Sequence, residues 1–132
     1  MNNKLSSLVL AAALLLPGAV SAADPALGIW QTEPDRKDLV SHIEIRACGA
    51  ALCGRVLRIF DLNGKPVTTA NLGRELFWDV KPKGGGAYDD GTVYVPLLNV
   101  TARARMQLSG DRLQVTGCKG PVCDGQNWRR VR

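Results

Sequence analysis

The most regular pattern in the chain is an alternation of apolar and polar residues between positions 99 and 109. The apolar positions are Val100, Ala102, Ala104, Met106 and Leu108, and polar residues separate them. A β-strand sorts such residues onto two faces, whereas a helix would scatter the apolar ones around its surface. The pattern therefore predicts a strand with Met106 inside and Arg103 and Arg105 outside. Leu113 and Val115 continue the inner face after a Gly-Asp turn at 110–111, as in a hairpin.

Similar short runs fill the rest of the chain, and no segment has a helical period. The predicted strands are 27–32, 38–47, 53–60, 75–81, 86–88, 92–97, 99–109, 112–118 and 126–131. The piece at 86–88 is weak, so the expected total is about eight strands. Segment 89–91 (Asp-Asp-Gly) is expected to form a tight turn, segment 84–86 (three glycines) a hairpin tip, and residues 61–74 the one long connection. Close turns between short strands predict an all-β fold, either an antiparallel up-and-down β-barrel or a sandwich.

Residues 1–22 have the pattern of a secretory signal peptide. Lys4 precedes an apolar stretch from Leu5 to Leu16, a Pro-Gly pair breaks it, and Val-Ser-Ala at 20–22 offers a cleavage site. The alternative is a membrane anchor, but a spanning helix needs about 20 apolar residues and this run is shorter. We expect a signal peptide at 1–22 and a single β-barrel domain at 23–132. The protein is then expected in the periplasm or secreted, and at most peripheral to a membrane.

Composition and charge narrow the class of protein. The 132 residues are 45% hydrophobic and 22% charged, which is typical of one globular domain and excludes a disordered chain or a polytopic membrane protein. The formal net charge is +5, with arginines placed along the predicted strands. Outside the cytoplasm no nucleic-acid partner is expected, and an anionic envelope component is the candidate. The alternative is a solvated outer face of a monomer.

Four cysteines form two pairs with the same spacing. Cys48 and Cys53 flank one predicted turn, and Cys118 and Cys123 flank another. Local pairing would contribute about 2 kcal/mol per bridge, whereas a crossed Cys48–Cys118 bridge would contribute about 4 kcal/mol. We expect the local pairing because each pair brackets its own turn. A four-cysteine zinc site is the alternative, but its usual spacing is shorter and export disfavours it, so we expect no metal.

Catalytic chemistry is scarce in the sequence. The only serines after residues 1–22 are Ser41 and Ser109, and neither lies in a Gly-x-Ser-x-Gly motif. His42 is the single histidine and has no partner motif, so it is interpreted as a surface residue of its strand rather than a general base. We expect no enzymatic activity and no cofactor.

Ordered motifs at the ends and in the middle of the chain resemble a known family. They are Gly-Ile-Trp at 28–30, Cys-Gly-Arg-Val at 53–56, Gly-Thr-Val-Tyr-Val-Pro at 91–96, Leu-Gln-Val-Thr-Gly-Cys at 113–118 and Trp-Arg-Arg-Val at 128–131. Their order is similar to that of the bacterial exported family catalogued as domain of unknown function 2147. The resemblance covers 28–131 and implies a fold and a compartment rather than an activity. Residues 61–74 are shorter than the corresponding family segment, and Val95 stands where the family often has Asp.

The two ends of the chain also resemble calycin barrels such as lipocalins. Those proteins carry Gly-x-Trp on the first strand and a basic residue near the last one. The resemblance implies that Trp30 plugs one end of the barrel and that Arg130 or Arg129 covers its indole.

These features favour a small exported barrel that binds an apolar or amphipathic, lipid-like molecule. Its cavity is expected beside the 61–74 connection, with Phe60, Phe77, Trp78 and Met106 as candidate ligand contacts. The alternative is that the aromatic side chains only complete the core. In that case the protein would be a surface interaction module for an envelope protein or anionic polymer.

Overall fold

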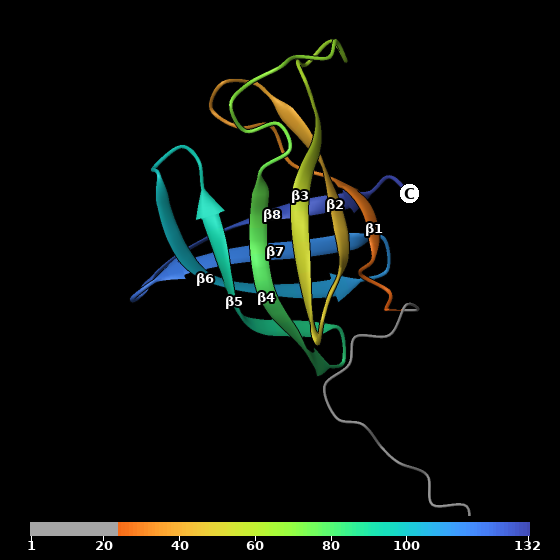
Figure 1. Cartoon of the computed structure of the whole chain (residues 1–132), viewed down its shortest axis with the longest axis vertical. Coiled ribbons are helices and arrows are strands. Elements are labelled where there is room, and N and C mark those ends of the chain that lie inside the picture. The colour runs from red at the N-terminus through yellow and green to blue at the C-terminus, as the bar shows by residue number, and fades with distance from the viewer. Residues whose placement is uncertain (1–23) are drawn as a thin grey trace, which may run out of the picture.

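The protein is an eight-stranded antiparallel β-barrel. The computed structural model describes residues 24–132, so the signal-peptide prediction for 1–22 lies outside the described residues. The strands are β1 (Gly28–Gln31), β2 (Val40–Cys48), β3 (Ala51–Phe60), β4 (Glu75–Gly84), β5 (Ala87–Val95), β6 (Val100–Ser109), β7 (Arg112–Lys119) and β8 (Val122–Arg130). Each strand pairs with the next, and β1 pairs with β8 to close the barrel (Figure 1). The predicted all-β up-and-down barrel is confirmed.

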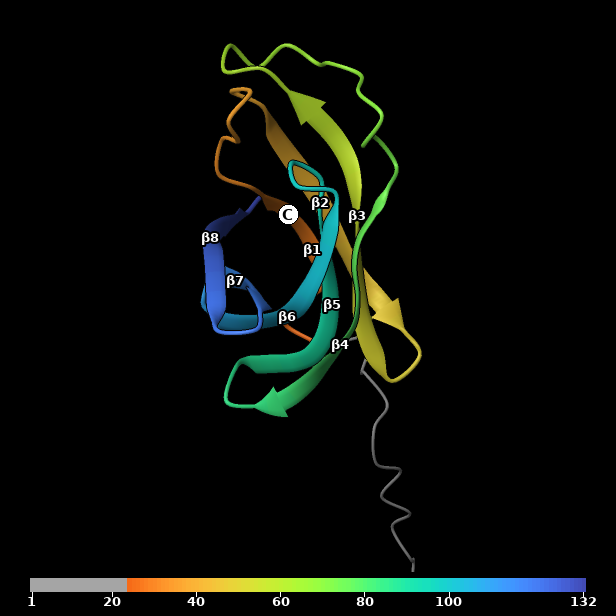
Figure 2. The same ribbon diagram turned by 90° about the vertical axis from the view of Figure 1, so that its left-hand side faces the viewer.

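The up-and-down order separates the connections into two groups. The connections β1–β2, β3–β4, β5–β6 and β7–β8 lie at one end of the barrel, which we call the open end. The other connections, together with the residues before β1 and after β8, lie at the closed end. Figure 2 shows β6, β7 and β8 on one side of the interior and β2, β3 and β4 on the other. Among residues 24–132, no helix is long and apolar enough to cross a membrane.

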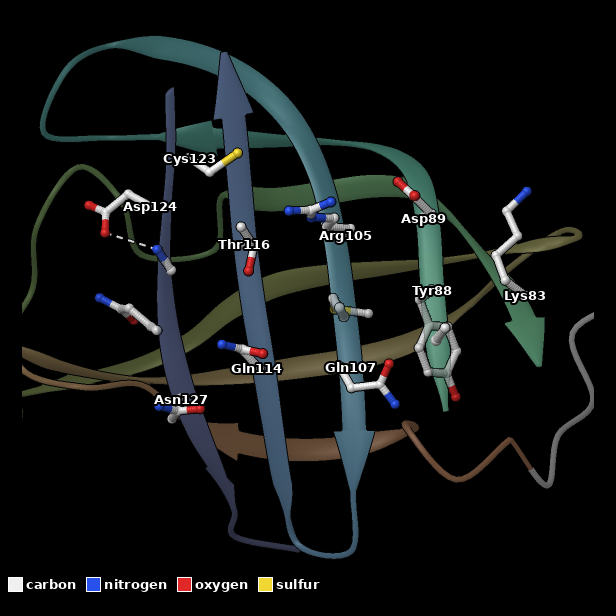
Figure 3. Close-up of a pocket in the computed structure, with 14 residues that line it drawn as sticks. Lys83, Tyr88, Asp89, Arg105, Gln107, Gln114, Thr116, Cys123, Asp124 and Asn127 are labelled. Carbon is white, nitrogen blue, oxygen red and sulfur yellow. Dashed lines mark hydrogen bonds between the residues drawn. The ribbon is translucent and has the colours of Figure 1, made fainter. Parts of the chain in front are cut away.

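The alternation along β6 and β7 sorts the side chains as predicted. Met106, Leu113 and Val115 are buried in the core, whereas Arg103 and Arg105 are exposed. Arg105 and Gln107 project from the outside of the barrel wall (Figure 3). No polar or charged residue is fully buried in the described part of the chain, so hydrophobic burial supplies the driving force for folding.

The turn predicted at 89–91 is wrong, because β5 runs through it as one strand. The pairing of β5 with β6 shifts its register between Tyr88 and Gly91, which is a β-bulge. Asp90 has a φ of 62°, and a Cβ on Gly91 would lie 2.3 Å from Val80 Cγ2. Asp and Gly tolerate positive φ and close backbone approach in bulges as well as in turns. The Asp-Asp-Gly segment is therefore compatible with either a turn or a β-bulge, and the structure has the bulge.

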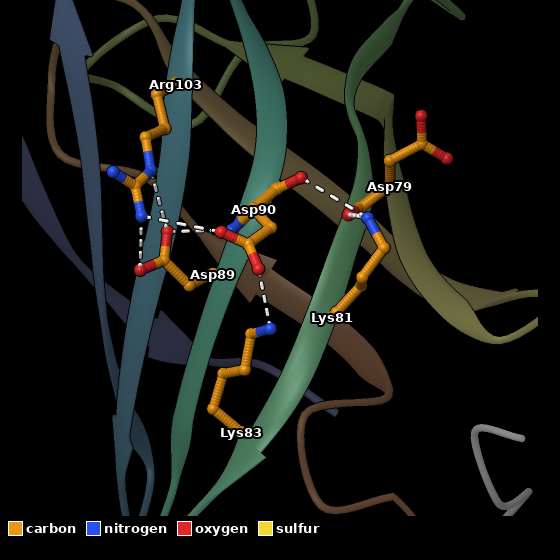
Figure 4. A network of polar contacts seen from close by, with 6 residues as sticks. All are labelled: Asp79, Lys81, Lys83, Asp89, Asp90 and Arg103. Atoms are coloured by element: carbon orange, nitrogen blue, oxygen red, sulfur yellow. Dashed lines mark hydrogen bonds and ion pairs between the residues drawn. The ribbon is translucent and has the colours of Figure 1, made fainter. Parts of the chain in front are cut away.

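Ion pairs hold this bulge on the outer wall (Figure 4). Arg103 binds both carboxylate oxygens of Asp89, at 2.9 and 3.1 Å, and Lys83 Nζ lies 2.6 Å from Asp90 Oδ2. The Lys83 ammonium lowers the pKa of Asp90 by hydrogen bonding and by its charge. Lys81 Nζ donates to the backbone oxygen of Asp79, at 3.1 Å. The ion pairs link the bulge of β5 to Lys83 of β4 and to Arg103 of β6.

Two other predicted boundaries differ from the structure. β8 begins at Val122 instead of residue 126, and β4 continues to Gly84. Asp124 and Gly125 carry no apolar alternation, yet they pair with Gly117 and Thr116 of β7. Backbone hydrogen bonds extend a hairpin beyond its apolar positions.

Both disulfides are local. Cys48 is bonded to Cys53 across the β2–β3 turn, and Cys118 is bonded to Cys123 across the β7–β8 turn. No free cysteine remains. The local pairing is confirmed, and because all four thiols are in disulfides, a four-thiolate zinc site cannot form.

Candidate functional site

The closed end is sealed by the first tryptophan of the barrel. Trp30 is fully buried, and its Nε1 donates to the Ala26 carbonyl at 2.9 Å. The Arg130 guanidinium lies 4.3 Å from the centre of the indole ring. It also donates to the Leu27 carbonyl and to Asp111, both at 3.1 Å. This is the placement of Trp30 and Arg130 that the calycin resemblance implies, and it keeps the indole out of solvent.

The chain before β1 is held against the same end. Tyr88 Oη donates to Asp24 Oδ1 at 2.8 Å, and the Ala26 amide donates to the same carboxylate at 2.9 Å. Burial, followed by the hydrogen bond to Asp24, raises the pKa of Tyr88 well above its usual value. The neutral phenol is therefore a structural donor.

The open end contains a cavity of about 510 Å³, which we call the mouth cavity. All four open-end connections, or the strand residues next to them, contribute to its lining. Its floor is apolar and consists of the buried side chains Ile43, Val56, Ile59 and Trp128. Leu39 and Leu76 extend the apolar surface up the wall, since both are partly buried against the core.

The rim of the mouth cavity is polar, with two exposed leucines. Leu97 and Leu98, which follow β5, expose 52% and 65% of their surface. The polar and charged lining residues are Thr32, Glu33, Asp35, Arg36, Lys37, Ser41, Thr69, Asn71, Asp124 and Gln126. An apolar floor below a polar rim matches the two parts of an amphipathic molecule.

The geometry offers no nucleophile–base pair at this cavity. Ser41 lines the cavity, but His42 is its neighbour on β2, and adjacent strand residues point to opposite faces. On the outer wall, His42 Nε2 lies 3.3 Å from Gln31 Oε1 and the ring packs against Phe60 at 4.8 Å. Burial, and then the charge of Arg58, lower the pKa of His42. Ser41 and His42 therefore do not act together at this cavity.

The structure does not bring the four predicted ligand contacts together. Phe77 is fully buried below the floor, with its ring centre 6.3 Å from that of Trp128. Met106 is a core residue, and Trp78 pairs with Thr92 on the opposite face from Phe77. Phe60 packs on His42 outside the barrel. None of the four lines the mouth cavity.

The residues that do form the cavity come from several strands and connections, and Trp128 of β8 lies far in sequence from Ile43 of β2. Alternation predicted that Ile43 faces inward, but the sequence did not place it beside Ile59 or Trp128. The up-and-down topology brings these residues together, because the connections β1–β2, β3–β4, β5–β6 and β7–β8 all lie at the open end. The long 61–74 connection borders the cavity through Thr69 and Asn71, on the side where a cavity was expected.

Comparisons with known proteins agree with this architecture. Residues 28–130 match a family described as "Uncharacterized protein conserved in bacteria (DUF2147)". The solved structure of protein HP1028 from Helicobacter pylori, described as belonging to the lipocalin family, is similar with a TM-score of 0.64. The likeness covers 80% of this chain and 82% of that chain at 17% sequence identity, so it concerns the fold alone. None of the curated proteins matches the chain.

Proposed function

Because this chain belongs to the DUF2147 family of bacterial proteins and folds as a lipocalin-like barrel, we propose that it binds one small apolar or amphipathic molecule in the mouth cavity. The observation that carries the proposal is the contrast between the two ends of the barrel. The closed end is sealed by Trp30 and Arg130, whereas the open end has a cavity with an apolar floor.

The size and lining of the cavity define the ligand class. Its volume of about 510 Å³ lies within the range of small-molecule sites. An acyl or other apolar group would pack on Ile43, Ile59 and Trp128, gaining about 0.8 kcal/mol for each buried CH₂. The rim carries Arg36 and Lys37 as well as the carboxylates of Glu33, Asp35 and Asp124, so it offers partners to a polar end of either charge.

Two segments of the rim are suited to covering a bound chain. Leu97 and Leu98 expose large apolar side chains beside the cavity, where they could pack on the part of a ligand that leaves the floor. The 61–74 connection lies on the same rim through Thr69 and Asn71. The activity that we propose is binding without catalysis.

Tryptophan fluorescence tests the proposal with a fatty acid such as palmitate and with a lysophospholipid. Trp128 lies in the floor, whereas Trp30 lies at the closed end and Trp78 on the outer wall. We expect a saturable change that is lost in Trp128→Phe and retained in Trp78→Phe.

A pair of variants on one strand provides the matched control. Ser41→Phe should fill the cavity and abolish binding, whereas Val40→Phe adds the same ring to the opposite face of β2 and should leave binding unchanged. Equal affinities in the two variants, or no saturable change with any apolar ligand, would contradict the proposal.

The two disulfides are typical of an extracytoplasmic compartment. We propose that the protein acts in the periplasm or outside the cell after residues 1–22 are removed. Cell fractionation with N-terminal sequencing should recover a chain that starts at Ala23. A cytoplasmic protein that still begins at Met1 would contradict this location.

A further inference from the structure

A second surface with its own chemistry lies on the outside of β6, β7 and β8. The strand register aligns Gln107 with Gln114 and Gln114 with Asn127, so three amide side chains form one row. Two residues farther along, the register aligns Arg112 with Arg129. We call Arg105, Gln107, Arg112, Gln114, Asn127 and Arg129 the polar face. Figure 3 shows Arg105, Gln107, Gln114 and Asn127 side by side on this wall.

The arginines of the polar face have no counter-charge in the structure. Arg112 and Arg129 occupy directly opposite positions of neighbouring strands, an arrangement that is unfavourable for like charges. Within residues 24–132, neither they nor Arg105 form a side-chain hydrogen bond or an ion pair. Arg103, by contrast, binds Asp89. The polar face therefore presents three guanidinium groups to solvent without an intramolecular counter-charge.

Of the carboxylates around this face, two are paired with arginines outside it and two accept hydrogen bonds from the backbone. Asp89 binds Arg103, and Asp111 binds Arg130. Glu33 accepts a hydrogen bond from the backbone N–H of Asn127 at 2.9 Å, and Asp124 accepts one from the backbone N–H of Gly125 at 2.9 Å. These groups border the surface and leave its three guanidinium groups facing solvent.

The surface is also hollowed along its length. Arg105, Gln107, Gln114 and Asn127 line a depression of about 690 Å³. Arg112 and Arg129 line a second one of about 620 Å³, together with Gln31 and Ser109. The amide row and the arginine row are two residues apart on each strand, a spacing of about 7 Å, so the depressions adjoin.

The chemistry of the face selects one class of partner. Side-chain amides donate and accept hydrogen bonds, as sugar hydroxyls require, and guanidinium groups bind carboxylate or sulfate in a bidentate manner. A protein partner would favour exposed aromatic residues at the centre, and the face has none. We propose that the polar face binds an anionic polysaccharide, with the guanidinium groups on its acidic substituents and the amides on its hydroxyls. This site lies outside the barrel wall and does not depend on a ligand in the mouth cavity.

Binding to polygalacturonate and dextran sulfate, compared with neutral dextran, tests the proposal. We expect saturable, salt-sensitive binding to the two acidic polymers only. Arg112→Gln with Arg129→Gln should weaken it at least about tenfold, since each charge-assisted hydrogen bond contributes more than a neutral one. Arg58→Gln with Lys65→Gln removes the same charge on β3 and the connection after it, outside both proposed sites, and should leave the affinity within about twofold.

A charge-neutral variant separates a built site from general attraction. Gln107→Ala with Gln114→Ala keeps the net charge and should still weaken binding several-fold. The substituted residues are exposed, so thermal melting should show that all variants remain folded. An equal loss of affinity in the Arg112/Arg129 double variant and in its charge-matched double control would overturn the proposal. So would an absence of binding, or equally tight binding to polyphosphate or to vesicles containing phosphatidylglycerol.

Discussion

At the residue scale, the contacts of single positions in the barrel wall decide which side chains are tolerated. Gly54 on β3 and Gly117 on β7 both have an ordinary backbone conformation, so space is the difference between them. A Cβ on Gly54 would lie 2.3 Å from Phe77 Cε1, and Phe77 is fully buried. A Cβ on Gly117 would lie 3.1 Å from Val93 Cγ1.

Gly54→Ala should therefore lower the free energy of unfolding by about 1–3 kcal/mol through overpacking of the Phe77 ring. Gly117→Ala should cost clearly less, because small shifts of Val93 relieve the contact. Urea unfolding of both variants measures the two costs. Equal stabilities would show that the Phe77 ring can move in the core.

His42 gives the fold a pH dependence of definite sign. Burial and Arg58 lower its pKa in the folded protein, so the unfolded chain takes up the proton first as the pH falls. Its stabilising contribution is present above its ordinary pKa of 6.5 and is lost as the pH falls through the lower folded value.

The melting temperature should thus fall as the pH is lowered below about 7, and this part of the dependence should be absent in His42→Gln. His42 is the single histidine, which makes the variant an internal control. Parallel pH profiles of the two proteins between about pH 5.5 and 7.5 would contradict the assignment.

At the element scale, alternation fixes the direction of each side chain but not the path of the strand. β6 has an unbroken alternation and follows the predicted face along its whole length. β5 carries a bulge at Asp90, and the two strand pieces predicted on either side of it are one element. The bulge inserts one extra residue into β5, so Tyr88 before it and Gly91 after it both face inward although they are three positions apart.

The two faces of β6 should respond differently to substitution. Met106→Asp places an unpaired charge in the core and should cost about 3 kcal/mol or more. Arg103→Gln breaks an ion pair with Asp89 on a side chain that is 56% exposed, and should cost about 1 kcal/mol or less. Thermal melts that rank the two variants in the opposite order would mean that the strand faces the other way.

At the scale of the whole molecule, the two ends of the barrel differ in their packing. Arg130 covers Trp30 and ties the segment before β1 and the β6–β7 turn to the closed end. The mouth cavity lies at the other end, where no residue of this cluster contributes to its lining.

Arg130→Gln should lower the free energy of unfolding by about 1–3 kcal/mol, because it removes the cation–π contact and the hydrogen bonds of the guanidinium group to Asp111, Leu27 and Pro25. The affinity for a mouth ligand should be unchanged, whereas Ser41→Phe should lose affinity with a smaller effect on stability. Chemical denaturation and fluorescence titration of both variants separate the effects. Loss of affinity in Arg130→Gln would show that the two ends are coupled.

The sequence by itself determined the features that depend on near neighbours along the chain. Alternation along 99–109 is a local property, and it predicted the buried Met106 and the exposed Arg103 and Arg105. The equal spacing of Cys48 with Cys53 and of Cys118 with Cys123 predicted two hairpin bridges, since a disulfide joins residues that a turn already brings close. The many short strands predicted the all-β barrel.

The tertiary structure alone decided which distant residues meet. Phe77 and Trp78 are neighbours in sequence and have similar chemistry, but one lies in the core and the other on the outer wall. Ile43, Ile59 and Trp128 come together only because the closed barrel brings β2, β3 and β8 to one end. The arginine pair at 112 and 129 likewise depends on the β7–β8 register. Such sites are set by strand order and register, which arise from the closure of the whole sheet, and a local pattern does not encode them.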